Sequence, residues 1–129
     1  MRRMFILLLG LLGIATLAAR AEETTGHDMS SMPANWSKPV EIAMLVYPGF
    51  TALDLAGPQY AFGNIMGAKV HIVSRTMEPV TSDTGLTIMP TATYDQVPET
   101  VDVLFVPGGA LSTLAAIRNP ELIAFVRSR

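Results

Sequence analysis

Two nearly continuous apolar runs, each stopped by glycine, constrain the fold of this chain more than any other feature. The first run, VEIAMLVY, covers Val40–Tyr47 and meets Pro48-Gly49, and the second, VDVLFVPGG, covers Val101–Gly109. Apolar and polar residues do not alternate in either run, so each predicts a strand that is covered on both faces, as in a parallel sheet. Helices are then expected on both sides of that sheet.

The segments between the two runs predict further elements in an order typical of α/β domains. AKVHIVS, Ala68–Ser74, is expected to form a strand that buries Val70, Ile72 and Val73 and turns His71 toward solvent. PVTSDTGLTIMP, residues 79–90, predicts a short hairpin that turns at residues 82–85, with Gly85 supplying the left-handed backbone. This order predicts an α/β domain with a largely parallel sheet.

A turn and a helix are expected between the first two strands, over Thr51–Met66. Pro58 is expected near the first turn of that helix, because proline disrupts a helix interior. The apolar side of the helix is expected to consist of Leu53, Tyr60, Ala61, Ile65 and Met66.

Two helices are expected after the second run. Ser112 or Thr113 could cap a short helix that ends near Arg118. The sequence Asn119-Pro120-Glu121 then combines a capping amide, a proline at the first helical position and an acid in the first turn. It predicts a helix that extends to Arg129.

The first 38 residues are expected to lie outside this domain. Residues 1–21 have a basic start, a short apolar run and the small residues of ARA at Ala19–Ala21, which together predict a cleaved secretory signal peptide. An uncleaved N-terminal anchor is the alternative. Residues 22–38 are polar and aperiodic, which indicates a flexible linker, and residues 39–129 remain for the domain. The chain is therefore expected to be exported, periplasmic or secreted, with membrane contact only during export.

Charge and cysteine content narrow the function classes. The chain has 9 basic and 11 acidic residues, and cleavage after Ala21 would remove three of the basic ones and none of the acids, leaving a net charge of −5. Phosphate neutralisation needs Lys and Arg, so such a chain is a poor nucleic-acid binder. The chain contains no cysteine, so its domain has to be stable without disulfides.

Three residues of the linker could bind copper. His27, Met29 and Met32 offer an imidazole and two thioethers at short spacing, a donor set that suits Cu(I). The alternative is a solvated tail with no ligand, and short flexible segments more often take that role.

Asp54 is the candidate catalytic residue, because it is the only charged residue between Glu41 and Lys69 and follows a buried strand. In parallel sheets, sites form at the carboxyl ends of the strands. A carboxylate there can act as a general acid or base. The alternative is a capping box, in which Thr51 caps the helix and Asp54 returns a hydrogen bond to the Thr51 N–H.

Gly108 and Gly109 also follow a strand and precede a helix, so they are candidate binding residues. Their N–H groups could form a small nest that accepts an anion. The alternative is a tight turn whose backbone angles only glycine adopts.

Several motifs together resemble the front half of the DJ-1/PfpI superfamily, in particular its isonitrile hydratase-like branch. These are AMLVYPGFTALDLAGPQYAF, SDTGLTIMPTATYD, VDVLFVPGG and NPELIAFVRSR. The resemblance implies a flavodoxin-like sandwich of the class I glutamine amidotransferase type, often homodimeric, with a small-molecule substrate and no metal or organic cofactor. It also implies a cysteine on a sharp strand-to-helix turn, with an acid from the first strand's loop against the thiol. In isonitrile hydratases these groups add water to an isonitrile, which gives an N-substituted formamide.

By that resemblance Asp54 matches the acid, and Gly108 and Gly109 match the loop near the cysteine. The cysteine itself is missing, since the family's cysteine strand would follow a helix like Asn119–Arg129. We therefore expect an N-terminal fragment, truncated before the nucleophile strand and inactive as this chain. The alternative is a non-catalytic small-molecule or protein-binding domain, a pseudoenzyme completed by a partner chain. Some relatives are transcription regulators with a DNA-binding module, which the signal peptide and the acidic charge argue against here.

Half of a doubly wound domain also leaves apolar strand edges open, and open edges pair with other chains. The chain alone is therefore expected to be marginally stable or prone to aggregation. A soluble monomer with a sharp thermal transition would contradict this expectation.

Overall fold

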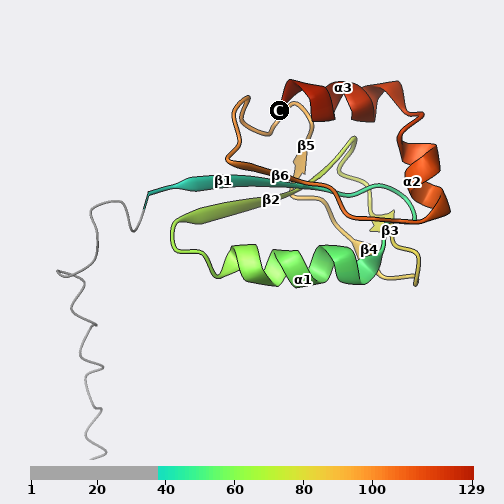
Figure 1. Cartoon of the computed structure of the whole chain (residues 1–129), viewed down its shortest axis with the longest axis horizontal. Helices are drawn as coiled ribbons and strands as arrows, with labels where there is room; N and C mark the ends of the chain where they lie inside the picture. Colours follow the sequence, from blue (N-terminus) through green and yellow to red (C-terminus); the bar gives the residue numbers. More distant parts are fainter. Residues whose placement is uncertain (1–37) are drawn as a thin grey trace, which may run out of the picture. The chain divides into compact units, whose positions relative to one another are not determined.

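The computed structural model describes residues 38–129, which form six strands and three helices (Figure 1). The predicted signal peptide, nearly all of the linker, and the candidate copper ligands lie outside the described residues. The strands and helices run in the order β1 (Val40–Leu45), α1 (Ala52–Gly63), β2 (Ala68–Ser74), β3 (Val80–Thr81), β4 (Thr87–Ile88), β5 (Ala92–Thr93), β6 (Val103–Phe105), α2 (Leu111–Ala116) and α3 (Pro120–Ser128). None of these helices is both long and apolar enough to cross a membrane.

A parallel sheet with the strand order β5-β2-β1-β6 forms the centre of the domain. β1 pairs with β2 from Val40↔Ala68 to Leu45↔Val73, and on its other side β1 pairs with β6 from Ile42↔Val103 to Met44↔Phe105. β1 thus has a neighbour at each edge, and its last four residues are fully buried. The predicted α/β domain with a largely parallel sheet is confirmed, and so is the flavodoxin-like fold that the family resemblance implies.

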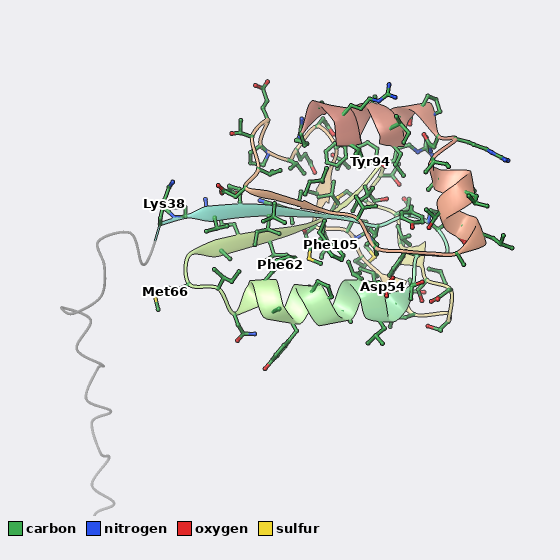
Figure 2. The ribbon with its side chains drawn as sticks, in the orientation of Figure 1. Lys38, Asp54, Phe62, Met66, Tyr94 and Phe105 are labelled. Carbon is green, nitrogen blue, oxygen red and sulfur yellow. The ribbon has the colours of Figure 1, made fainter. Side chains whose placement is uncertain are left out.

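Helices cover both faces of this sheet, with α1 on one side and α3 on the other (Figure 1). On the α1 side, Leu55 is buried and the Phe62 ring meets Phe105 edge-on at 6.0 Å between ring centroids (Figure 2). On the α3 side, Leu122 and Phe125 are buried, and the Phe125 ring stacks on Tyr94 at 4.5 Å.

The prediction of which side of α1 is buried is wrong. Leu53 and Tyr60 are 77% and 75% exposed, Ala61, Ile65 and Met66 are exposed as well, and Leu55 is the buried residue of the helix. Apolar residues occur all around this helix, so the face that meets the sheet is decided by tertiary packing. Pro58 lies inside the helix, beyond its first turn, so the carbonyl of Asp54 loses the N–H partner that another residue at 58 would supply.

The second strand of the prediction, β2, has the expected bounds, but His71 does not simply face solvent. Its side chain lies half-buried on the sheet, and Nε2 is 2.8 Å from Oε2 of Glu41, whose Oε1 also meets Lys69 at 3.1 Å. The two hydrogen bonds hold the pKa of the Glu41 carboxyl below its usual value, with His71 the larger cause. The register explains this contact: Glu41 lies opposite Lys69 and His71 lies opposite Ala43, so Glu41 and His71 are diagonal neighbours, two residues apart in register, and share a face.

The run over residues 101–109 forms a much shorter strand than expected. β6 has three residues, all partly buried, because among the described strands it has a partner only in β1. Asp102 turns its carboxylate back to the start of β1, where Oδ2 accepts a hydrogen bond from Glu41 N–H at 2.9 Å.

The predicted helix cap is confirmed for α3, and the prediction for α2 is wrong. Asn119 Oδ1 accepts hydrogen bonds from the N–H groups of Glu121 and Leu122, so the predicted start of α3 is confirmed. Ser112 and Thr113 lie inside α2, and the residue at its cap position is Ala110, which has no side chain for capping. The predicted hairpin is confirmed as β3–β4, with Gly85 at φ +87° in its turn.

Candidate active site

The carboxyl ends of β1 and β6 lie side by side, since these strands are parallel neighbours. The chain leaves β1 toward α1 and leaves β6 toward α2, and the two loops are joined by hydrogen bonds. Thr51 N–H donates to the Gly108 carbonyl at 2.8 Å, and Gly108 N–H donates to Asp54 Oδ2 at 3.1 Å. Asp54 lies at the N-terminal end of α1, where the loop after β6 passes (Figure 2). The structure therefore brings Asp54 and Gly108 together.

The capping-box alternative for Asp54 is not what the structure contains. The Thr51 side chain makes no capping hydrogen bond, and the Thr51 N–H is bound to Gly108. The first turn of α1 is capped instead by Asp83 of the β3–β4 turn, whose Oδ1 accepts from Ala52 N–H at 3.1 Å. The Asp54 and Asp83 side chains therefore both lie at the N-terminal end of α1 and make hydrogen bonds to backbone N–H groups there.

The β3–β4 hairpin is fixed to the loop after β1 by two further hydrogen bonds. Asp83 N–H donates to the Phe50 carbonyl at 2.9 Å, and Gly49 N–H donates to the Thr81 carbonyl at 2.8 Å. Three hydrogen bonds thus connect the hairpin to the segment that carries Asp54.

Positions 108 and 109 need glycine because other groups of the site lie where a Cβ atom would be. Neither residue has a positive φ, so the turn conformation does not require glycine. A Cβ at Gly108 would lie 2.6 Å from Asp54 Oδ2, and one at Gly109 would lie 3.0 Å from both the Gly49 carbonyl and the Tyr47 hydroxyl. The Gly108 N–H is already bound by Asp54, so the pair does not form a nest with two free donors.

Two residues of the site were not singled out by sequence reasoning. Ala110 has φ +45° and ψ −117°, a conformation that favours glycine, directly after the Gly108-Gly109 step. Tyr47 is buried at the end of the apolar run, and its hydroxyl contacts the Pro107 carbonyl and Thr113. A signal for Tyr47 was available, because a tyrosine buried at a strand end needs a partner for its hydroxyl. Ala110 offers no signal in the sequence.

The arrangement presents one exposed carboxylate, oriented by a backbone N–H, at the edge where parallel strands end. Such a group can accept or deliver a proton. Among residues 38–129, no three His, Asp or Glu side chains converge as a metal site would require. The full sequence contains no cysteine, so a thiol nucleophile is not part of this chain.

A parallel sheet covered by helices, with a carboxylate where β1 and β6 end, defines a flavodoxin-like α/β protein with a site at the carboxyl edge of the sheet. The sequence pattern of the DJ-1/PfpI family matches residues 40–129, and the chain belongs to that family.

Similar proteins and solved structures support this membership. The isonitrile hydratase of Pseudomonas putida is 36% identical over 90 residues, which are 70% of this chain and 39% of that enzyme. A ThiJ/PfpI family protein from Pseudomonas syringae is 48% identical, with a TM-score of 0.73 over 88% of this chain and 46% of that one. A DJ-1 superfamily protein from Agrobacterium tumefaciens is 27% identical, with a TM-score of 0.56 over 70% of this chain and 49% of its own. The chain thus spans less than half the length of each of these relatives.

Proposed function

We propose that this chain is the N-terminal part of an exported, isonitrile hydratase-like enzyme in which Asp54 is the general acid–base. The observation that carries the proposal is the Asp54 carboxylate, held by Gly108 N–H where β1 and β6 end. The reaction class is supported by the sequence of the chain, which is 36% identical to an isonitrile hydratase over 90 residues.

Hydration of an isonitrile adds one water to R–NC and gives R–NH–CHO. The carbon gains the oxygen and one hydrogen, and the nitrogen gains the other hydrogen. These proton movements need a group that gives and takes a proton, and a carboxylate in contact with the reacting thiol does both in turn. Asp54 is proposed for this role, with Gly108 holding its Oδ2 so that the other oxygen faces the reactants.

The thiol would come from outside this chain, since these residues contain no cysteine. The chain by itself is therefore proposed to be inactive. A second possibility is a non-catalytic binding domain that a partner chain completes. It is favoured by the position of β6 at the edge of the described sheet, and by exposed apolar side chains in the segment that follows this strand, at Val106, Leu111, Leu114 and Ile117.

The first experiment is the intact mass of the native protein from the exported fraction of its own host. A mass near that of residues 22–129 favours the binding domain. A mass about twice as large, with a cysteine a short distance after Arg129, favours the enzyme.

The role of Asp54 is then tested in the full-length protein with an isonitrile substrate. Asp54→Asn is expected to lower kcat/KM by about 10²-fold or more, because it removes the proton-transfer group and keeps the shape. Asp83→Asn is the matched control. It removes the charge of a carboxylate at the same helix end, and the asparagine side chain can still cap the helix. Equal activity in both variants would contradict the assignment of Asp54, whereas an inactive wild type would contradict the reaction class.

A further inference from the structure

We propose that Tyr47 is a positioning residue for Asp54, acting through the peptide group that joins Pro107 to Gly108. The inference rests on the proposed function only in giving Asp54 its acid–base role. The contacts that carry it are all within the described residues.

The Tyr47 hydroxyl is the centre of a short hydrogen-bond chain. Tyr47 is 4% exposed, and its O–H donates to the Pro107 carbonyl at 2.8 Å. A tyrosine hydroxyl has a single proton, so the Thr113 hydroxyl at 3.0 Å is the donor to Tyr47. The chain runs from Thr113 in α2, through Tyr47 at the end of β1, to the loop after β6.

The Pro107 carbonyl and the Gly108 N–H belong to one planar trans peptide group, so they point in opposite directions. Tyr47 holds the carbonyl end of this group, and Asp54 Oδ2 binds its N–H end at 3.1 Å. A hydrogen bond at one end fixes the rotation of the plane and polarises the bond at the other end. The Tyr47 hydroxyl therefore aims the Gly108 N–H at the carboxylate.

The next peptide group, between Gly108 and Gly109, is fixed from the opposite side. Its carbonyl accepts the Thr51 N–H at 2.8 Å, so Gly108 is held in both of its flanking planes. The Tyr47 ring also lies against Gly109, where a Cβ would come within 3.2 Å of Cε2 and 3.0 Å of the hydroxyl. The two glycines thus allow the carboxylate and the tyrosine to approach the same loop.

Loss of the Tyr47 hydroxyl would leave the buried Pro107 carbonyl without this partner. Rotation of the peptide group toward another donor would then be favoured, and rotation turns the Gly108 N–H away from Asp54. Thr113 contributes through Tyr47, so its removal is expected to act in the same direction with a smaller effect.

The test is proton–nitrogen NMR of the Gly108 amide, which needs neither substrate nor activity. An amide that donates to a carboxylate changes its proton shift when the acid is protonated, so the Gly108 shift is compared at neutral and at acid pH. Asp54→Asn should abolish this displacement at Gly108, which assigns it. Tyr47→Phe should reduce the displacement at least two-fold, and Thr113→Val should reduce it less.

Tyr60→Phe is the matched control. This tyrosine is 75% exposed, and its hydroxyl makes none of the hydrogen bonds that join Thr113, Tyr47 and Pro107. It should leave the displacement unchanged. If Tyr47→Phe does not fold, Thr113→Val gives the same readout. If this chain associates through β6, the spectra are recorded on the full-length protein.

A full displacement in Tyr47→Phe or Thr113→Val, together with a lowered melting temperature, would overturn the proposal, since Tyr47 would then only pack. Loss of the displacement in Tyr47→Phe, together with no hydratase activity in the full-length wild type, would support the positioning role and contradict the reaction class. The two conclusions are thus separable.

Discussion

Alanine at position 49 is expected to destabilise the domain for two separable reasons. Gly49 has φ +78°, and an L side chain in the left-handed region costs about 1–2 kcal/mol. A Cβ at this position would also overlap Ser112 Oγ and lie 2.9 Å from Ser112 Cβ, and overpacking of this kind costs about 1–3 kcal/mol. The stiffer unfolded chain of alanine offsets about 0.5 kcal/mol. The expected loss in free energy of unfolding is therefore about 1.5–4.5 kcal/mol.

Gly85→Ala separates the two contributions. Gly85 has φ +87°, but no atom lies within 4 Å of its Cβ position, so only the backbone term of about 1 kcal/mol remains. Combining Gly49→Ala with Ser112→Gly removes the overlapping atoms, and the double-mutant cycle should return a coupling energy of about 1–3 kcal/mol. Ser112→Gly alone gives the cost of glycine in α2.

Urea unfolding, followed by far-ultraviolet circular dichroism, measures the stability of the wild type and of all four variants. Equal losses for Gly49→Ala and Gly85→Ala, with no coupling to Ser112, would refute the steric argument. No loss in either variant would refute the backbone argument as well.

Three further predictions concern a strained residue, a cap and a charge cluster. Ala110→Gly should stabilise the domain by about 1 kcal/mol in urea unfolding, because glycine adopts φ +45° without strain; an unchanged midpoint would contradict the strain. Asn119→Ala should lower the stability by about 1 kcal/mol, since two N–H groups of α3 lose their acceptor, and Asn119→Asp should restore it. The His71 and Lys69 hydrogen bonds lower the pKa of Glu41, so their stabilisation is present near neutral pH and is lost as the pH falls through the acid range in which this carboxyl becomes protonated. Glu41→Gln should therefore show a shallower loss of stability over this acid range, and an unchanged pH profile would count against the cluster.

The sheet could be predicted because its evidence is local in the sequence. A run such as Val40–Leu45 fits only a strand with both faces covered, and Asn119-Pro120 fits only a helix start. α1 lacks a local signal of this kind, since Leu53 and Leu55 point to opposite sides of the helix. Only packing against β1 and β2 decides that Leu55 is the buried one. Strand β6 is short for a similar reason, because its length depends on what pairs with its edges.

The site could be predicted in part. Asp54 stands out as an isolated acid after a buried strand, and the family resemblance connects it with Gly108 and Gly109. Its hydrogen bond to Gly108 spans 54 residues and depends on β1 and β6 being neighbours, which no local pattern encodes. Tyr47 looks like one more apolar residue of the strand until the position of Pro107 is known.

The hydrogen bonds at the start of α1 have a consequence for the order in which a growing chain folds. The cap of this helix comes from Asp83, 31 residues later, and the partner of Asp54 comes from Gly108, 54 residues later. Contacts of such long range form only after the loop-closure entropy has been overcome. On the ribosome, α1 therefore stays uncapped until the hairpin has emerged. Asp54 reaches its final orientation only when β6 has docked beside β1. The Asp54 carboxylate is thus oriented late in synthesis, because its hydrogen bond with Gly108 can form only after β6 has paired with β1.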